Sequence, residues 1–151
     1  MARKITHIVI HCTGGPQNQT VAQIQRYWRE SLGWKSPGYH VIILPDGSTQ
    51  ILQDYEKKTN GVAGHNANSI HICYIGGVDR LGRFVDNRTL QQQFRMKVLV
   101  QVLLQQYPGV KVCGHRDFSP DKNGNGKIEA SEFVKQCPCF DVASWMKKEL
   151  N

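Results

Sequence analysis

The chain has 151 residues, of which 40% are hydrophobic and 21% are charged, and its formal net charge is +7. This length and composition are typical of one soluble globular domain with an ordinary core, and they exclude a disordered chain. The positive charge favours an anionic partner, but the Lys and Arg residues are scattered and are not interleaved with aromatic residues. We therefore expect electrostatic steering and no specific nucleic-acid binding.

The N-terminus and the cysteines bear on the compartment of the protein. The opening sequence, Met-Ala-Arg-Lys-Ile-Thr-His, has no apolar segment with a cleavage site, and no apolar stretch approaches about 18 residues. Five cysteines are an odd number, and three of them lie in or beside apolar runs, which argues against a disulfide framework. We expect synthesis in the cytoplasm without a signal peptide, and no membrane insertion.

The first predicted element is an apolar strand that begins at His7. Ile8, Val9 and Ile10 form a continuous apolar run, which is typical of a strand covered on both faces of a sheet. A Gly-Gly-Pro break follows within a few residues, so His11 stands at the end of the strand. Site residues are common at such positions, although a single His is more often structural.

A helix and a hairpin are predicted next. The sequence from Thr20 to Gln23 matches a capping box, and Gly33 ends the helix. Segments 38–44 and 48–52 flank the turn sequence Pro-Asp-Gly, which predicts a hairpin, and residues 57–69 form a polar surface loop. The apolar face of the helix is predicted to consist of Val21, Ile24, Tyr27, Trp28 and Leu32.

The second half of the chain continues the alternation of strands and helices. Strands are predicted at 69–77 and 110–113, with a charged turn region at 78–88 between the first of them and a long helix. A last helix begins at Asp141 and turns Val142, Trp145 and Met146 inward. The core face of the long helix, which begins at Thr89, is predicted to consist of Leu90, Phe94, Val98, Leu99, Val102 and Leu103. The order of elements predicts an α/β fold over residues 1–151, a single domain whose mixed central sheet is flanked by helices.

Three residues at the ends of elements are of the types that bind zinc. His11 follows the first strand, His115 follows the short strand at 110–113, and Cys137 precedes the last helix. Two imidazoles and a thiolate make an open zinc site that keeps one position for water and lowers its pKa towards ~7. Without a short-range ligand motif, spacing leaves a second interpretation open, in which the three residues are unrelated.

Several segments occur together in a specific order. They are His11-Cys12-Thr13, Gly38-Tyr39-His40-Val41-Ile42-Ile43, Asp46-Gly47, His65-Asn66-x-Asn68-Ser69-Ile70, Gly76-Gly77, His115 and Lys135-x-Cys137-Pro138-x-Phe140-Asp141. With these segments in this order, the chain resembles the zinc-dependent N-acetylmuramoyl-L-alanine amidases of the phage-lysozyme and peptidoglycan-recognition-protein superfamily. The resemblance runs along nearly the whole chain. It implies the amidase fold and zinc-dependent hydrolysis of the amide bond between N-acetylmuramic acid and L-alanine.

The resemblance also implies roles for individual residues. His11, His115 and Cys137 match the zinc ligands, and Cys137 favours an enzyme because recognition-only relatives replace this cysteine. Tyr39 matches the tyrosine that sits over the metal, and Lys135 matches the lysine two positions before the ligand cysteine. From electrostatics we expect Lys135 to stabilise the oxyanion, and Tyr39 to position the water, to donate a hydrogen bond to the oxyanion or to share proton transfer. Outside this context, Tyr39 would be an amphipathic residue at a sheet edge and Lys135 a solvated charge.

The other histidines receive smaller roles. His65 lies in a loop that matches the family, and we expect it to line the peptide-binding cleft. His40 alternates with Tyr39 along a strand, so we expect it to point to the opposite face and to be structural. His7 and His71 are expected at the surface or at an edge.

Between His115 and Cys137 the chain departs from the shorter phage enzymes. Residues 121–132 fit the calcium-loop pattern D-x-[DN]-x-[DN]-G-x5-E, which adds a possible Ca²⁺ to the Zn²⁺. The alternative is an Asn/Gly-rich turn that gives up its metal readily, because the loop is unpaired, has only three carboxylates and follows no clear helix. The calcium ligands would be Asp121, Asn123, Asn125, the carbonyl of Lys127, Glu129 and Glu132.

The expected partner is peptidoglycan. We expect a monomer that acts on the cell wall, either as a phage or prophage lysin or after export by another route. The alternative function is a non-catalytic module that binds peptidoglycan or inhibits a partner protein. The presence of Cys137 with Lys135 favours the enzyme.

Overall fold

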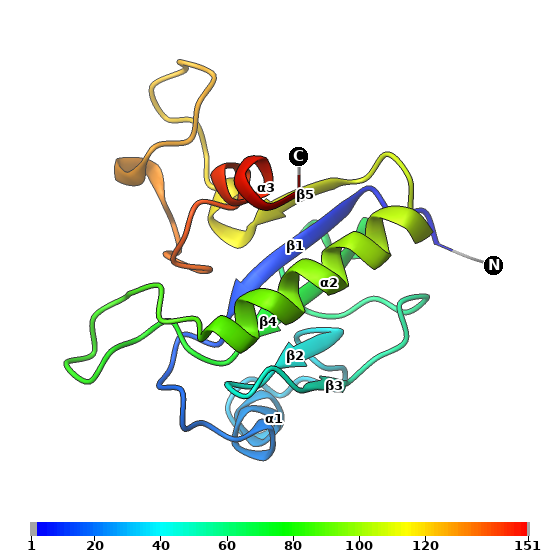
Figure 1. Cartoon of the computed structure of the whole chain (residues 1–151), viewed down its shortest axis with the longest axis vertical. Helices are drawn as coiled ribbons and strands as arrows, with labels where there is room; N and C mark the ends of the chain where they lie inside the picture. Colours follow the sequence, from blue (N-terminus) through cyan, green and yellow to red (C-terminus); the bar gives the residue numbers. More distant parts are fainter. Residues whose placement is uncertain (1–2, 151) are drawn as a thin grey trace.

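A mixed sheet of five strands forms the centre of the computed structural model, which describes residues 3–150 (Figure 1). Strand order is β3-β2-β4-β1-β5, where β1 is parallel to β4 and β5, and β2 is parallel to β4 and antiparallel to β3. The strands are β1 (His7–Cys12), β2 (Val41–Ile43), β3 (Thr49–Ile51), β4 (Ser69–Tyr74) and β5 (Lys111–Gly114), and the α-helices are α1 (Val21–Glu30), α2 (Leu90–Gln106) and α3 (Val142–Leu150). The predicted α/β fold with a mixed sheet flanked by helices is confirmed.

Alternating residues of β1 divide the core between the two faces of the sheet. Ile8 and Ile10 pack in one cluster with residues of α2 and α3, so these two helices cover the same face. Val9 points to the opposite face, and the parallel register places it beside His71 of β4. The continuous apolar run in β1 is therefore explained by burial on both sides.

Helix α1 covers part of the second face. The predicted capping box is present, because Thr20 Oγ1 accepts the N–H of Gln23 at 3.1 Å and the Gln23 side chain accepts the N–H of Thr20 at 2.9 Å. Val21, Ile24 and Trp28 are buried against Ile42, Cys73 and Ile75, as the sequence predicts for the first three. Tyr27 and Leu32, which are 56% and 41% exposed, do not belong to this packed face.

The predicted core face of α2 was wrong in part. Leu90, Phe94 and Val102 are 79%, 66% and 53% exposed, and the buried side is formed by Gln92, Met96, Val100 and Leu103. Apolar residues lie on two sides of this helix, so periodicity alone does not identify the buried one. Gln92 is compatible with burial because its amide donates to the carbonyls of Ile43 and Ile75, at 3.2 and 3.0 Å.

Two loops extend from this core. The hairpin between β2 and β3 is confirmed, and Asp46 Oδ1 accepts the N–H of Ser48 at 2.9 Å at its turn. Residues 121–132 form a loop that projects from the upper part of Figure 1, with one 3₁₀ turn at Ala130–Glu132.

We predict that the two sides of α2 respond differently to truncation. Met96→Ala removes a fully buried side chain, so the free energy of unfolding should fall by about 2–5 kcal/mol, whereas Phe94→Ala should change it by less than about 1 kcal/mol. Urea unfolding of the two variants and the wild type measures both changes. A larger loss for Phe94→Ala than for Met96→Ala would contradict the observed orientation of the helix.

Candidate functional site

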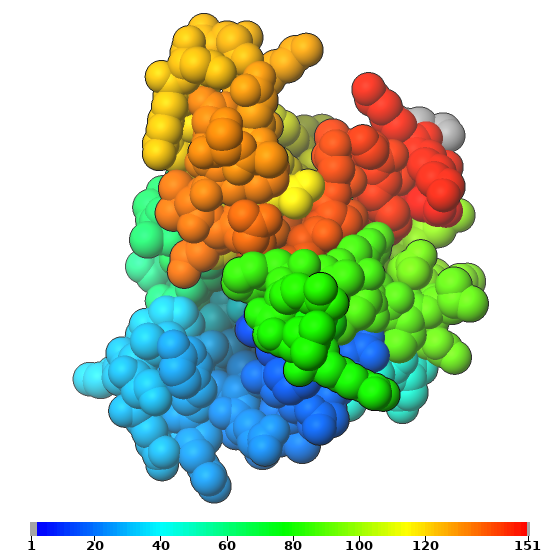
Figure 2. Space-filling model, turned by 90° about the vertical axis from the view of Figure 1, so that its left-hand side faces the viewer, coloured from blue at the N-terminus to red at the C-terminus, as the bar shows by residue number. Residues whose placement is uncertain are grey.

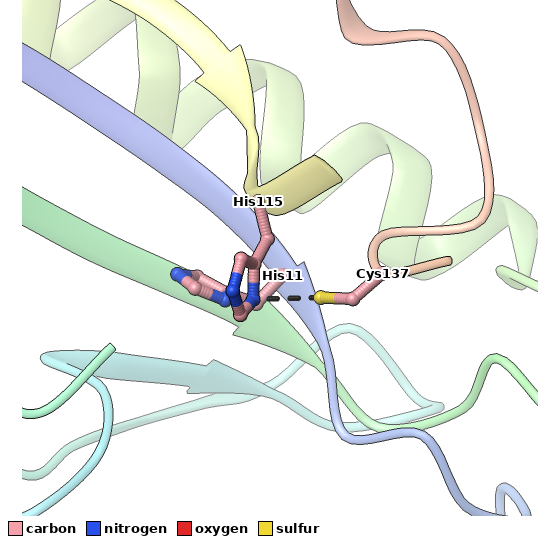
Figure 3. A group of neighbouring side chains, drawn as sticks. All are labelled: His11, His115 and Cys137. Carbon is pink, nitrogen blue, oxygen red and sulfur yellow. Dashed lines mark hydrogen bonds between the residues drawn. The ribbon is translucent and has the colours of Figure 1, made fainter. Parts of the chain in front are cut away.

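Two histidines and a cysteine meet at the carboxyl ends of parallel strands. His11 lies near the end of β1, His115 is the first residue after β5, and Cys137 lies in the loop before α3 (Figure 3). One ligand atom from each of these residues lies within 4.8 Å of the others. We call this group the His–His–Cys cluster. Because β1 and β5 are parallel neighbours, their ends bring the two imidazoles together.

Contacts to β1 and to the segment after β5 hold Cys137 in place. The backbone N–H of Cys12 donates to Cys137 Sγ at 3.1 Å, and this sulfur lies 3.7 Å from His11 Nδ1. The carbonyl of Cys137 accepts the N–H of Arg116 at 2.9 Å. The next carbonyl, that of Pro138, accepts the hydroxyl of Tyr74 at 2.7 Å. The thiol therefore has a fixed position although it comes from a long loop.

Burial keeps the imidazoles of the cluster neutral. Desolvation, followed by the nearby His71, His115 and His40, lowers the pKa of His11 well below its usual value. Desolvation and then Lys135 lower the pKa of His115 to about 4. Neutral imidazoles are the form that binds metals, because a protonated ring has no free lone pair.

The donor set fits zinc. Two neutral imidazoles and one thiol form the ligand set of an open zinc site, and no carboxylate of the described residues joins them. Within residues 3–150, this is the one group of three or more His, Cys, Asp or Glu side chains whose donor atoms converge in this way.

A groove of about 730 Å³ runs past the cluster. His115, Tyr39 and Lys135 line it, together with aromatic and aliphatic side chains from α1 and the segment that follows. Figure 2 views this side of the molecule, with the chain around residues 120–140 (orange) above the chain around residues 20–40 (blue to cyan). Two exposed apolar residues, Tyr27 of α1 and Leu32 just after this helix, form a wall of the groove next to Trp28 and Trp34.

Tyr39 stands between this wall and the cluster. The centroid of its ring lies 5.0 Å from that of His11 and 5.4 Å from that of Trp28. Burial, followed by the nearby Cys73 and Cys137, raises the pKa of Tyr39 well above its usual value. The phenol is therefore a hydrogen-bond donor at neutral pH.

A third histidine lies behind the cluster, and the sequence prediction for it was wrong. His71 is fully buried and is not at the surface or at a sheet edge. His71 Nδ1 lies 2.8 Å from His11 Nε2, and His71 Nε2 lies 2.9 Å from Asn66 Oδ1. The strand pairing that brings His71 to this face has no signal in the local sequence, because β4 is buried along its whole length.

His40 has the structural role that its position predicts. Its Nδ1 accepts the N–H of His71 at 3.0 Å, and its Nε2 donates to the carbonyl of Lys57 at 2.7 Å. Desolvation lowers the pKa of His40 to about 4. Desolvation, followed by electrostatic repulsion from His40 and His115, lowers the pKa of His71 to about 3.

The other predicted site residues lie elsewhere. His65 is exposed and packs against Phe118, with ring centroids 4.3 Å apart. In the loop at 121–132, Asp121 accepts the N–H groups of Gly124 and Gly126, at 3.0 and 2.7 Å. Glu132 is buried and accepts the N–H of Glu129 at 2.9 Å. Asn123 and Asn125 direct their side-chain amides to the carboxylate of Glu129, and Lys127 is exposed.

The fold and the cluster together define the type of protein. Residues 1–132 match the family described as N-acetylmuramoyl-L-alanine amidase, and the chain belongs to this family. It is 46% identical over 104 residues to an uncharacterised protein of Haemophilus influenzae, and this alignment covers 69% of the present chain and 90% of the Haemophilus protein. It is 32% identical over 142 residues to the endolysin of Enterobacteria phage T3, which covers 93% of this chain and 85% of the endolysin.

A solved structure shares the fold. The N-acetylmuramoyl-L-alanine amidase LysC from Clostridium intestinale superimposes with a TM-score of 0.74 at 22% identity, over 97% of this chain and 85% of LysC. Within the described residues, no helix has the length and the apolar character that crossing a membrane requires.

The buried neutral histidines predict acid sensitivity of the metal-free protein. The pKa values of His40, His71 and His115 in the folded state are about 4, 3 and 4, below the ordinary value of 6.5, so the unfolded state takes up protons first as the pH falls. The free energy of unfolding should therefore decrease by a total on the order of a few kcal/mol between pH 6.5 and pH 4. Urea unfolding in the presence of a chelator measures it, and a constant value across this range would contradict the prediction.

Proposed function

We propose that the protein hydrolyses peptidoglycan at the amide bond between N-acetylmuramic acid and L-alanine, with zinc at the His–His–Cys cluster. One observation carries the proposal: in a chain of the amidase family, two neutral imidazoles and a thiol converge beside a groove. The name of the related phage protein, an endolysin, supports action on the cell wall.

The cluster supplies the ligands of the proposed site. His11, His115 and Cys137 would hold the zinc, which when bound polarises a carbonyl group and lowers the pKa of a coordinated water. The N–H of Cys12 fixes the thiol, and β1 and β5 fix the imidazoles, so the three donors need little rearrangement to bind the ion.

Tyr39 and Lys135 supply the polar groups around the scissile bond. Lys135 and His115 both line the groove, and the charge of Lys135 contributes to the lowered pKa of His115. The ammonium group of Lys135 therefore lies within electrostatic reach of the cluster. In the proposed reaction it stabilises the negative charge that develops on the carbonyl oxygen. The protonated phenol of Tyr39, beside His11, donates a hydrogen bond to the same oxygen or orients the attacking water.

The groove and the net charge suit the proposed substrate. Trp28, Trp34 and Tyr27 present aromatic surface, which binds sugar rings and peptide side chains through their apolar faces. The net charge of +7 raises the rate of encounter with anionic cell-wall polymers, and this effect weakens as the salt concentration rises.

Digestion of purified peptidoglycan, followed by mass spectrometry of the products, tests the bond that is cleaved. We expect a free lactyl carboxyl group on N-acetylmuramic acid and a free amino group on L-alanine. Cys137→Ser should remove one zinc ligand, leave the protein with well under one zinc per chain and lower the activity by at least about 100-fold. Cys113→Ser, which changes a buried thiol outside the cluster, is the matched control and should retain about one zinc per chain.

Two results would contradict this proposal. Products cut at glycosidic or peptide bonds would show a different hydrolase. Binding of peptidoglycan without any product, in wild type and Cys137→Ser alike, would show a binding module.

The role of Lys135 predicts a loss of turnover. Lys135→Ala should lower kcat by about 10²–10³-fold with a smaller change in KM, because the ammonium group acts on charge that develops in the transition state. Lys135→Arg should keep part of the activity. Lys122→Ala, which removes an exposed lysine of the same segment that does not line the groove, should behave as the wild type. An unchanged kcat for Lys135→Ala would show that the lysine is only a solvated charge.

We also propose that residues 121–132 bind calcium, on the strength of their match to the calcium-loop pattern. Asp121 and Glu132 already accept backbone N–H groups of the loop, so calcium would share these oxygens. Since the loop joins His115 to Cys137, ordering it should raise the melting temperature of the wild type during a calcium titration, and Glu132→Gln should abolish the rise. A melting temperature that stays constant across the titration would end the proposal.

A further inference from the structure

A backbone N–H group determines the orientation of the Asn66 side chain. The N–H of Val62 donates to Asn66 Oδ1 at 2.8 Å, and the same oxygen lies 2.9 Å from His71 Nε2. A backbone amide can only donate, so this atom must be the oxygen of Asn66 and not its nitrogen. His71 Nε2 must then carry a proton and donate to the oxygen.

The direction of this hydrogen bond propagates to His11. A neutral imidazole that is protonated at Nε2 accepts at Nδ1, so His71 Nδ1 accepts from His11 Nε2 at 2.8 Å. His11 is therefore protonated at Nε2, and its Nδ1 keeps a lone pair. This Nδ1 is the atom that lies 3.7 Å from Cys137 Sγ (Figure 3).

We propose that His71 is a positioning residue: held by Asn66, it keeps His11 in the tautomer and ring orientation that present the Nδ1 lone pair to the metal. This inference rests on the proposed zinc site. A histidine ligand commonly donates its second ring N–H to an acceptor, which fixes the ring and increases its basicity. In this protein the acceptor is a second imidazole on the neighbouring strand.

The surrounding chain is built to accept the ring of His71. A Cβ atom at Gly61 would lie 2.3 Å from His71 Nδ1, so a glycine is required where the loop crosses the ring. The backbone N–H of His71 also donates to His40 Nδ1, and the two rings are nearly parallel with centroids 6.0 Å apart. His71 is fully buried, so water does not compete for either of its nitrogen atoms.

A matched pair of variants tests the proposal through zinc affinity, measured by competition with a chromophoric chelator on the metal-free protein. His71→Leu removes the acceptor and should weaken zinc binding by about 10–100-fold. His71→Asn places an amide oxygen near the position of Nδ1 and should restore the affinity to within about 3-fold of the wild type. His7→Asn makes the same chemical change on β1, outside the contacts of His11, and should leave the affinity unchanged.

Two-bond ¹H–¹⁵N spectra of the wild-type imidazoles provide a second test that needs no variant. We expect His71 to be protonated at Nε2 alone, both before and after zinc is added. A proton on His71 Nδ1, or a folded His71→Leu variant that binds zinc as tightly as the wild type, would overturn the proposal. Failure of the wild type to bind zinc would instead overturn the proposed function, because the spectra of the metal-free protein report the tautomer of His71 independently.

Discussion

The parallel pairing of β1 with β4 and β5 is the constraint on which the site depends. Parallel strands end at the same edge of a sheet, so His11 and His115 meet although about a hundred residues separate them in the chain. The same pairing places His71 next to Val9, on the face that also carries His11. One arrangement of hydrogen bonds between strands therefore brings together both imidazoles of the cluster and the imidazole behind them.

The third member of the cluster depends on different contacts. Cys137 belongs to no strand or helix, and hydrogen bonds to Cys12 and Arg116 hold its segment against the end of β1. The adjacent Pro138 is tied to Tyr74 of β4. These bonds replace the order that regular secondary structure supplies to the two histidines, and they fix the sulfur although the chain between His115 and Cys137 includes the long loop at 121–132.

Three polar side chains inside the core are paired, and this pairing gives them defined roles. His40, His71 and Gln92 are fully buried, and all of them bond to backbone groups or to other side chains. An unpaired group at these depths would cost about 1–3 kcal/mol. His40 and Gln92 join strands to neighbouring segments, whereas His71 joins the core to the cluster. Burial of His40 and Gln92 thus stabilises the fold, whereas burial of His71 has a proposed role at the cluster.

The sequence by itself determined the residue types at the ends of elements. The apolar run before His11, the short strand before His115 and the position of Cys137 before the last helix marked three candidate donors, and the capping box at Thr20 located the first helix, because these signals are local. Spacing left the three candidates unassigned, and the resemblance to the amidase family matched them to zinc ligands. Only the tertiary structure decided which side of α2 is buried and that His71 lies inside. The amide of Gln92 becomes a core group through the carbonyls of Ile43 in β2 and of Ile75, which directly follows β4. A strand buried on both faces has no polar alternation to reveal its register. Both outcomes depend on partners that are distant in the sequence.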